Sequence, residues 1–160
     1  MNKLDVIQNK LIKEDELAGK LAYWNFLDKK IVFTNGCFDV IHLGHIMYLS
    51  QAADLGSVLV IGLNTDESVR RIKGSSRPLM DQHARSMILG SLFFVDAVLL
   101  FDEDTPLELI KKVKPHVLVK GSDYLEKDIV GADVVKSYGG EVVTIDFVDG
   151  YSSSNIINKL

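Results

Sequence analysis

Residues 33–45 read FTNGCFDVIHLGH. The stretch joins an apolar strand, a short turn at Gly36 and the pattern His-x-Gly-His, which opens a predicted helix. A helix start presents free backbone N–H groups and the positive end of the helix dipole, and both favour phosphate. His42 and His45 share one helical face because they are three residues apart, and Gly44 lets a ligand approach the backbone closely. The stretch therefore predicts a phosphate site between a strand and a helix.

Outward from this stretch, apolar runs of strand length alternate with helical patterns. The run VLVIGL is continuous rather than alternating, which is typical of a strand buried on both faces of a parallel sheet. Alternating strands and helices imply βαβ units. We therefore predict an α/β, Rossmann-like fold in which a five-stranded parallel sheet carries helices on both faces. The predicted strands are 31–33, 58–63, 95–101, 117–119 and 142–145. The predicted helices are 14–28, 44–55, 81–92 and 152–160, with shorter ones from 65, from 105 and before 139.

Length and composition indicate one globular domain. The chain has 160 residues, of which 47% are hydrophobic and 25% charged, and this length suits a single core. We expect residues 1–29 to form an N-terminal helical arm and residues 30–160 to form the main domain. The net charge of −4 gives no support to a nucleic-acid or membrane-surface partner. No apolar run approaches the ~20 residues of a membrane span, and the N-terminus lacks the apolar centre of a signal peptide.

The chain holds a single cysteine, Cys37. An intrachain disulfide is thereby excluded, and a reducing compartment is indicated. We therefore expect a cytoplasmic protein. The glycine spacing fits neither Gly-x-Gly-x-x-Gly nor Gly-x-x-x-x-Gly-Lys-Ser/Thr, which argues against a dinucleotide redox site and against a P-loop kinase.

The His-x-Gly-His pattern at this position resembles the nucleotide-binding signature of the cytidylyltransferase-like nucleotidyltransferases. Within that family the chain most resembles the D-glycero-β-D-manno-heptose 1-phosphate adenylyltransferases. The resemblance covers about residues 30–160, and its ordered set of segments is more specific than the signature alone. The supporting segments are TNGCFD (34–39), LNTD (63–66) with Val69, RIKG (71–74), RP (77–78), DEDTP (102–106), VKGSDY (119–124), GGEV (139–142) and GYSSS (150–154).

The resemblance implies a nucleotidyltransferase fold and transfer of AMP from ATP to the heptose 1-phosphate. The products are ADP-heptose for lipopolysaccharide core synthesis and pyrophosphate. It also implies Mg²⁺ carried with ATP, no metal site of the protein's own, and a homodimer. Such a reaction needs positioning and charge stabilisation rather than a general base, because the attacking phosphate is already ionised. Alternatives are a cytidylyltransferase for glycerol 3-phosphate or another phospho-alcohol, an FMN adenylyltransferase, and a non-catalytic module that senses ATP.

The same resemblance assigns residues to the site. It implies that His42, His45 and Lys73 are catalytic. It implies nucleotide contacts from Asn35, Gly36, Cys37, Phe38, His42, Gly44, His45, Lys120, Gly121, Asp123, Ser152, Ser153 and Ser154. It implies contacts with the acceptor phosphate from Lys73, Arg77 and Arg85.

Structural interpretations stay open for several residues in these segments. Asp39 could be catalytic or could stabilise its turn. Arg85 could form a structural ion pair instead of binding substrate, and Asp123 could cap a turn. The three serines at 152–154 could be an ordinary helix N-cap.

Overall fold

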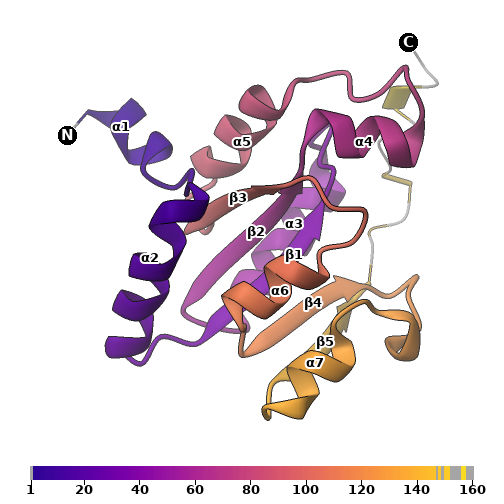
Figure 1. The fold of residues 1–160 in the computed structure, drawn as a ribbon. Helices are drawn as coiled ribbons and strands as arrows, with labels where there is room; N and C mark the ends of the chain where they lie inside the picture. The colour runs from indigo at the N-terminus through magenta and orange to yellow at the C-terminus, as the bar shows by residue number, and fades with distance from the viewer. Residues whose placement is uncertain (1, 147, 149, 152–155, 158–160) are drawn as a thin grey trace.

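The computed structural model describes residues 2–146, 148, 150, 151, 156 and 157, and Figure 1 shows the arrangement. The strands are β1 (Ile31–Gly36), β2 (Val58–Asn64), β3 (Ala97–Phe101), β4 (Val117–Gly121) and β5 (Glu141–Ile145). The helices are α1 (Lys3–Gln8), α2 (Glu14–Phe26), α3 (Leu43–Ala53), α4 (Asp66–Lys73), α5 (Gln82–Ser91), α6 (Leu107–Val113) and α7 (Ala132–Ser137), with a 3-10 turn η1 (Glu126–Asp128).

The strands form one five-stranded sheet in the order β3-β2-β1-β4-β5, and each neighbouring pair is parallel. The predicted five-stranded parallel sheet is confirmed. β2 lies inside the sheet and every one of its residues is buried. A strand covered on both faces has no solvent side, which explains why its sequence is a continuous apolar run.

Helices cover both faces of the sheet, as predicted. On one face, α2, α6 and α7 bring Trp24, Ile110 and Val135 into a single core, and Figure 1 shows these helices in front of the sheet. On the opposite face, α3 and α5 contribute Leu49 and Leu89 to a second core, with α3 behind the sheet in the same view. The sheet therefore separates two packed layers.

The described part of the N-terminal segment, residues 2–29, packs on the rest of the chain. The backbone N–H of Ile12 donates to the carbonyl of Val98, and the N–H of Val98 donates to the carbonyl of Lys10. Leu17 and Trp24 of α2 are buried in the first core. The segment thus covers part of the open edge of β3 and shares the hydrophobic core of the main domain.

Two element boundaries differ from the prediction for local reasons. β3 begins at Ala97 rather than at residue 95, because the chain turns there: the N–H of Val95 donates to the carbonyl of Leu92. Helix α2 stops at Phe26, and Asp28 follows with φ of 52°, a left-handed conformation that a helix cannot continue through. Of the last predicted helix, 152–160, only 156 and 157 are described, and both are helical.

The strand order places a crevice at the carboxyl ends of β1 and β4. β1 pairs with β2 on one side and with β4 on the other, so the connections leave these two neighbouring strands in opposite directions. In open parallel sheets such a switch point is where ligands bind. The loop from β1 into α3, which carries the His-x-Gly-His pattern, lies at this point.

Candidate functional site

The turn after β1 is shaped by close contact between its backbone and one aromatic ring. Phe38 is buried and has φ of 44°. A Cβ atom added to Gly36 would lie 3.0 Å from that ring. A side chain at position 36 would crowd the ring, so glycine leaves room for the ring to fold back over the end of β1. The fold-back also brings the Phe38 ring centroid to 5.2 Å from that of His45.

The two histidines meet at the start of α3. His42 is the N-cap residue but makes no side-chain cap, and its ring stacks on that of His45 with centroids 3.8 Å apart. A Cβ on Gly44 would lie 3.0 Å from the His42 ring, so the glycine makes the stack possible. The Nδ1 atoms of both rings are buried and have no hydrogen-bond partner among the described residues. Buried polar atoms without partners are rare and indicate a missing ligand or solvent.

Both imidazoles have lowered pKa values. Burial lowers the pKa of His42. Burial also lowers the pKa of His45 to about 4, together with the charges of His42 and Lys73 and against a hydrogen bond to the backbone of Val40. Cations that are desolvated and close together cannot both ionise easily. An anion bound beside the stacked rings would oppose this shift, so the pair is suited to a ligand that brings negative charge.

Asp39 anchors the loop between α4 and α5 beneath this site. The residue is 2% exposed, and its carboxylate accepts hydrogen bonds from the N–H groups of Leu79 at 2.8 Å and Met80 at 3.1 Å. It also accepts a hydrogen bond from Nε of Arg77 at 2.6 Å. Burial opposes ionisation, but these hydrogen bonds and the Arg77 charge outweigh it, so the pKa of Asp39 is lowered. The geometry favours the turn-stabilising interpretation of Asp39 over a catalytic one.

Arg77 is positioned differently from an ordinary surface arginine. Nε is engaged by Asp39, and the side chain is 13% exposed. Its Nη2 atom is buried and has no hydrogen-bond partner among the described residues. The guanidinium is thus fixed at one edge and retains a donor, which suits an arginine that completes its hydrogen bonding on an anionic ligand.

The structure contradicts the assignment of Arg85 to the acceptor phosphate. Its side chain is completely buried. Nη1 donates to the carbonyls of Cys37 at 2.7 Å and Asn64 at 2.8 Å. Nε donates to the carbonyl of Met80, and Nη2 pairs with Asp66 at 2.7 Å. With these bonds made inside the fold, Arg85 ties the ends of β1 and β2 to α4 and α5, which is the structural alternative.

A cavity of about 510 Å³ opens beside the histidines at the ends of β1 and β4. It brings together most of the residues assigned from the sequence. Those that line it are Asn35, Gly36, Cys37, Phe38, His45, Lys73, Lys120, Gly121 and Asp123. His42, Gly44 and Arg77 stand next to lining residues rather than on the wall. Ser152, Ser153 and Ser154 lie outside the described residues, so their assignment stays a prediction.

Lys120 faces the cavity from the end of β4. Its ammonium donates to Oδ1 of Asn35 and lies 5.9 Å from the centre of the Tyr124 ring. Burial lowers the pKa of Lys120 to about 8, against the attraction of Asp123. A buried ammonium is costly unless an anion completes its surroundings. Lys120 therefore adds a second cation, besides Lys73, to a cavity that already adjoins the unpartnered histidine atoms.

Other residues of the cavity wall were not assigned from the sequence. Tyr48 hydrogen-bonds Thr34 at 2.8 Å, and burial raises its pKa to about 12. The remaining ones include Asn64, Ile72, Asp104, Thr105, Pro106, Tyr124 and the stretch 128–130. Residues 104–106 belong to the DEDTP segment, which carried the resemblance but gave no indication of a role. The only available signal was its place directly after a predicted strand.

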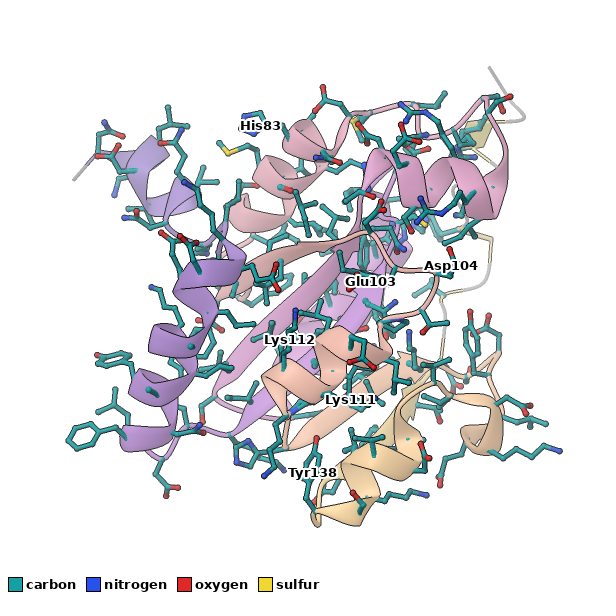
Figure 2. The ribbon with its side chains drawn as sticks, in the orientation of Figure 1. His83, Glu103, Asp104, Lys111, Lys112 and Tyr138 are labelled. Atoms are coloured by element: carbon teal, nitrogen blue, oxygen red, sulfur yellow. The ribbon has the colours of Figure 1, made fainter. Side chains whose placement is uncertain are left out.

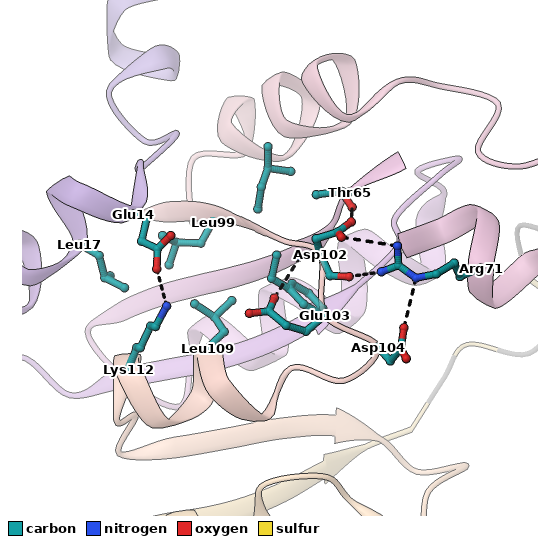
Figure 3. Close-up of a pocket in the computed structure, with 12 residues that line it drawn as sticks. Glu14, Leu17, Thr65, Arg71, Leu99, Asp102, Glu103, Asp104, Leu109 and Lys112 are labelled. Carbon is teal, nitrogen blue, oxygen red and sulfur yellow. Dashed lines mark hydrogen bonds and ion pairs between the residues drawn. The ribbon is translucent and has the colours of Figure 1, made fainter. Parts of the chain in front are cut away.

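A larger cavity of about 660 Å³ lies between α2, α6 and the end of β3. Figure 3 shows ion pairs among its charged side chains. Glu14 pairs with Lys112, and Arg71 bridges Asp102 and Asp104. These charged groups thus already have partners. The buried polar atoms that have no partner among the described residues adjoin the smaller cavity instead, and such atoms mark functional sites more reliably than volume does.

Comparisons with known proteins agree with this location. The family model described as Cytidylyltransferase-like matches residues 33–159. The bifunctional protein HldE of Geobacter metallireducens is 56% identical over 146 residues, which is 91% of this chain and 30% of that protein. HldE of Helicobacter hepaticus is 49% identical over 99% of this chain and 32% of its own length. The chain spans about a third of the length of the curated relatives it matches.

Solved structures show a similar fold. A lipopolysaccharide core biosynthesis protein from Thermoplasma volcanium superposes with a TM-score of 0.60 at 28% identity, covering 78% of this chain and 99% of that one. A pantoate-beta-alanine ligase from Francisella tularensis shares the fold alone, with a TM-score of 0.57 at 15% identity over 94% of this chain and 78% of its own. Within the described residues, no helix is long and apolar enough to cross a membrane.

Proposed function

The chain belongs to the cytidylyltransferase-like family, and from this membership we propose that it is an adenylyltransferase. In the proposed reaction, AMP passes from ATP to D-glycero-β-D-manno-heptose 1-phosphate, giving ADP-heptose and pyrophosphate. The observation that carries the proposal is the stacked pair His42 and His45, whose buried Nδ1 atoms have no partner among the described residues and stand at a helix N-terminus. A nucleoside triphosphate would supply the negative charge that this arrangement lacks.

The chemistry we propose is a direct displacement. An oxygen of the acceptor phosphate attacks the α-phosphorus of ATP, a new P–O bond forms, and the bond to the bridging oxygen of pyrophosphate breaks in line. No proton has to be removed, because the attacking phosphate is ionised at neutral pH. Mg²⁺ enters as part of the Mg·ATP substrate, coordinated by phosphate oxygens. The protein's task is positioning and stabilisation of developing charge.

Each side chain then has a defined role in the proposal. His42 and His45 donate to the α- and β-phosphate region, where charge builds as pyrophosphate leaves. Lys73 and Arg77 hold the acceptor phosphate. Lys120 adds charge at the centre of the cavity, where its ammonium contacts Asn35.

The base and the outer phosphates are assigned to flanking segments. The backbone of Asn35, Gly36, Cys37 and Phe38 lies under the nucleotide, and the loop that contains Gly121 and Asp123 borders adenine. Ser152, Ser153 and Ser154 bind the β- and γ-phosphates. The choice of heptose 1-phosphate as the acceptor is supported by the ordered set of sequence segments that resemble the heptose 1-phosphate adenylyltransferases. A role of the ADP-heptose product in lipopolysaccharide core synthesis is supported by the likeness to the lipopolysaccharide core biosynthesis protein of Thermoplasma volcanium.

We also propose that the protein works as a cytoplasmic homodimer. The single cysteine and an ATP-dependent reaction support the compartment, and the family resemblance supports the dimer. Sedimentation velocity of the purified chain tests the assembly. A species of twice the 17.8 kDa chain mass is expected, and a monomer at assay concentration contradicts the dimer.

The function is tested by pyrophosphate release in the presence of Mg²⁺. ATP and CTP are crossed against D-glycero-β-D-manno-heptose 1-phosphate, glycerol 3-phosphate and FMN. Release with ATP and the heptose phosphate alone is the expected result. Release only with CTP and glycerol 3-phosphate would be consistent with the proposed site but would contradict the proposed substrates. ATP binding without release in any combination would favour a sensing module.

A further inference from the structure

Helix α4 is fastened to the segment after β3 at its first residue. The backbone N–H of Thr65 donates to the carbonyl of Phe101 at 3.0 Å. The hydroxyl of Thr65 donates to the carboxylate of Asp102 and accepts the N–H of Ser68 at 3.1 Å, which caps the helix. The start of α4 is thus held by hydrogen bonds and also by packing, since Ser68 and Val69 are buried.

The end of α4 is held in a different way. All of residues 70–73 are exposed, so no buried side chain fixes the last turn. Arg71 reaches across to the segment after β3, where Nε donates to Asp104 at 3.2 Å and Nη1 to Asp102 at 3.5 Å. Its Nη2 donates to the backbone carbonyl of Asp102. Figure 3 shows this fork of contacts.

These contacts join the two walls of the active-site cavity. Ile72 and Lys73, directly after Arg71, line the cavity from α4. Asp104, Thr105 and Pro106 line it from the segment after β3. The helix ends at Lys73, and Gly74 follows with φ of 97°. The contacts of Arg71 therefore link the helix turn that carries Lys73 to the segment that forms the opposite wall.

The contribution of this network to folding is small. The side chains of Arg71, Asp102 and Asp104 are 44%, 60% and 82% exposed, and ion pairs as exposed as these contribute little to stability. A planar guanidinium that meets two carboxylates and a carbonyl nevertheless specifies geometry better than a point charge does. The network is suited to positioning rather than to stabilising the fold.

We propose that Arg71 is a positioning residue for the acceptor. It holds the last turn of α4 in the position from which the Lys73 ammonium can contact the acceptor phosphate. The inference rests on the proposed function, because it takes Lys73 as the group that holds this phosphate. Arg71 itself does not contact the substrate.

The chain offers a matched control one residue earlier. Arg70 lies on the same helix turn, has the same exposed fraction of 44% and carries the same charge. Its ion pair is with Glu67 of its own helix, at 2.7 Å. Replacing Arg70 therefore removes an equal charge at nearly the same place without releasing α4 from the segment after β3.

The test compares Arg71→Ala, Arg71→Lys and Arg70→Ala with the wild type. The acceptor kcat/KM of Arg71→Ala is expected to fall about 10-fold to 100-fold, as a displaced positioning group does. The Kd for ATP and the melting temperature are expected to stay near wild type. Arg71→Lys is expected to recover part of the loss, and Arg70→Ala to match the wild type. Equal acceptor kinetics for Arg71→Ala and Arg70→Ala would overturn the inference, as would a parallel loss of ATP affinity.

A binding readout separates this inference from the proposed function. Inorganic phosphate is titrated into each variant while the Lys73 side-chain signal is followed by NMR. Arg71→Ala is expected to weaken the phosphate response of Lys73, and Arg70→Ala to leave it unchanged. If the wild type turns over no acceptor, the proposed function fails and the titration still decides the role of Arg71. An identical Lys73 response in the two variants would overturn it.

Discussion

Two cavities in the described part of the molecule differ in how well their polar groups are satisfied. The larger one, about 660 Å³, is lined by ion pairs that are complete in themselves, such as Glu14 with Lys112. The smaller one, about 510 Å³, adjoins three buried nitrogen atoms that have no partner among the described residues: Nδ1 of His42, Nδ1 of His45 and Nη2 of Arg77. Folding leaves such atoms unpaired only where something else compensates. Unsatisfied polarity, rather than volume, therefore identifies the site.

The sharpest test of this contrast is His45→Ala. Loss of one preorganised donor to the developing charge is expected to reduce turnover about 10²-fold to 10³-fold, measured as pyrophosphate release at saturating substrates. His83→Ala is the control, because His83 is exposed on α5 (Figure 2). Near-normal turnover in His45→Ala would remove the histidine pair from the mechanism.

Lys73→Ala separates the acceptor from the nucleotide. A charged hydrogen bond to the acceptor phosphate is lost, so kcat/KM for the acceptor is expected to fall about 10-fold to 100-fold. The ATP affinity is expected to change much less. Lys111→Ala on α6 (Figure 2) is a control of equal charge, because Lys111 pairs with Glu108 on the surface. A loss confined to ATP binding would indicate that Lys73 contacts the nucleotide rather than the acceptor phosphate.

The neutral state of His45 predicts a pH dependence of stability. Its pKa is about 4 in the folded protein and 6.5 as the ordinary value. The unfolded chain therefore binds the proton first, and folding free energy is lost as pH falls from about 6.5 to about 4. The loss approaches about 3 kcal/mol. Urea unfolding of wild type and His45→Gln checks this: the two curves should diverge between pH 7 and pH 4.5, with His45→Gln retaining more stability. Parallel curves would mean that His45 is not buried as a neutral group.

The smallest effect is expected at the Glu14–Lys112 ion pair of the larger cavity. Glu14→Gln removes one partner of an exposed ion pair, and turnover should stay within about twofold of the wild type. Lys112→Ala should behave in the same way. A clear loss of turnover in either variant would indicate that the larger cavity contributes to the reaction. Unsatisfied polar atoms would then fail to identify the functional cavity.

The fold was predictable because its signals are local. A continuous apolar run such as residues 58–63 must be covered on both faces, and the glycine turn with His-x-Gly-His places a phosphate site wherever the strand ends. The same short stretch contains Gly44, which leaves room for His42 to stack on His45. The stacked rings carry the two buried Nδ1 atoms that have no partner among the described residues.

The misassigned and missing residues depend on contacts between distant segments. Arg77 and Arg85 were both assigned to the acceptor phosphate, yet Arg85 is enclosed by carbonyls and a carboxylate from three other parts of the chain. No local pattern distinguishes the two arginines. Asp104 likewise has the sequence surroundings of a solvated acidic loop residue, and only the fold brings it opposite Lys73.

The most direct measurement is a crystal structure of the chain with a nonhydrolysable ATP analogue and Mg²⁺. The triphosphate is expected in the smaller cavity, with its oxygens bonded to the rings of His42 and His45. A nucleotide seated between α2 and α6, with both Nδ1 atoms still unpartnered, would contradict it.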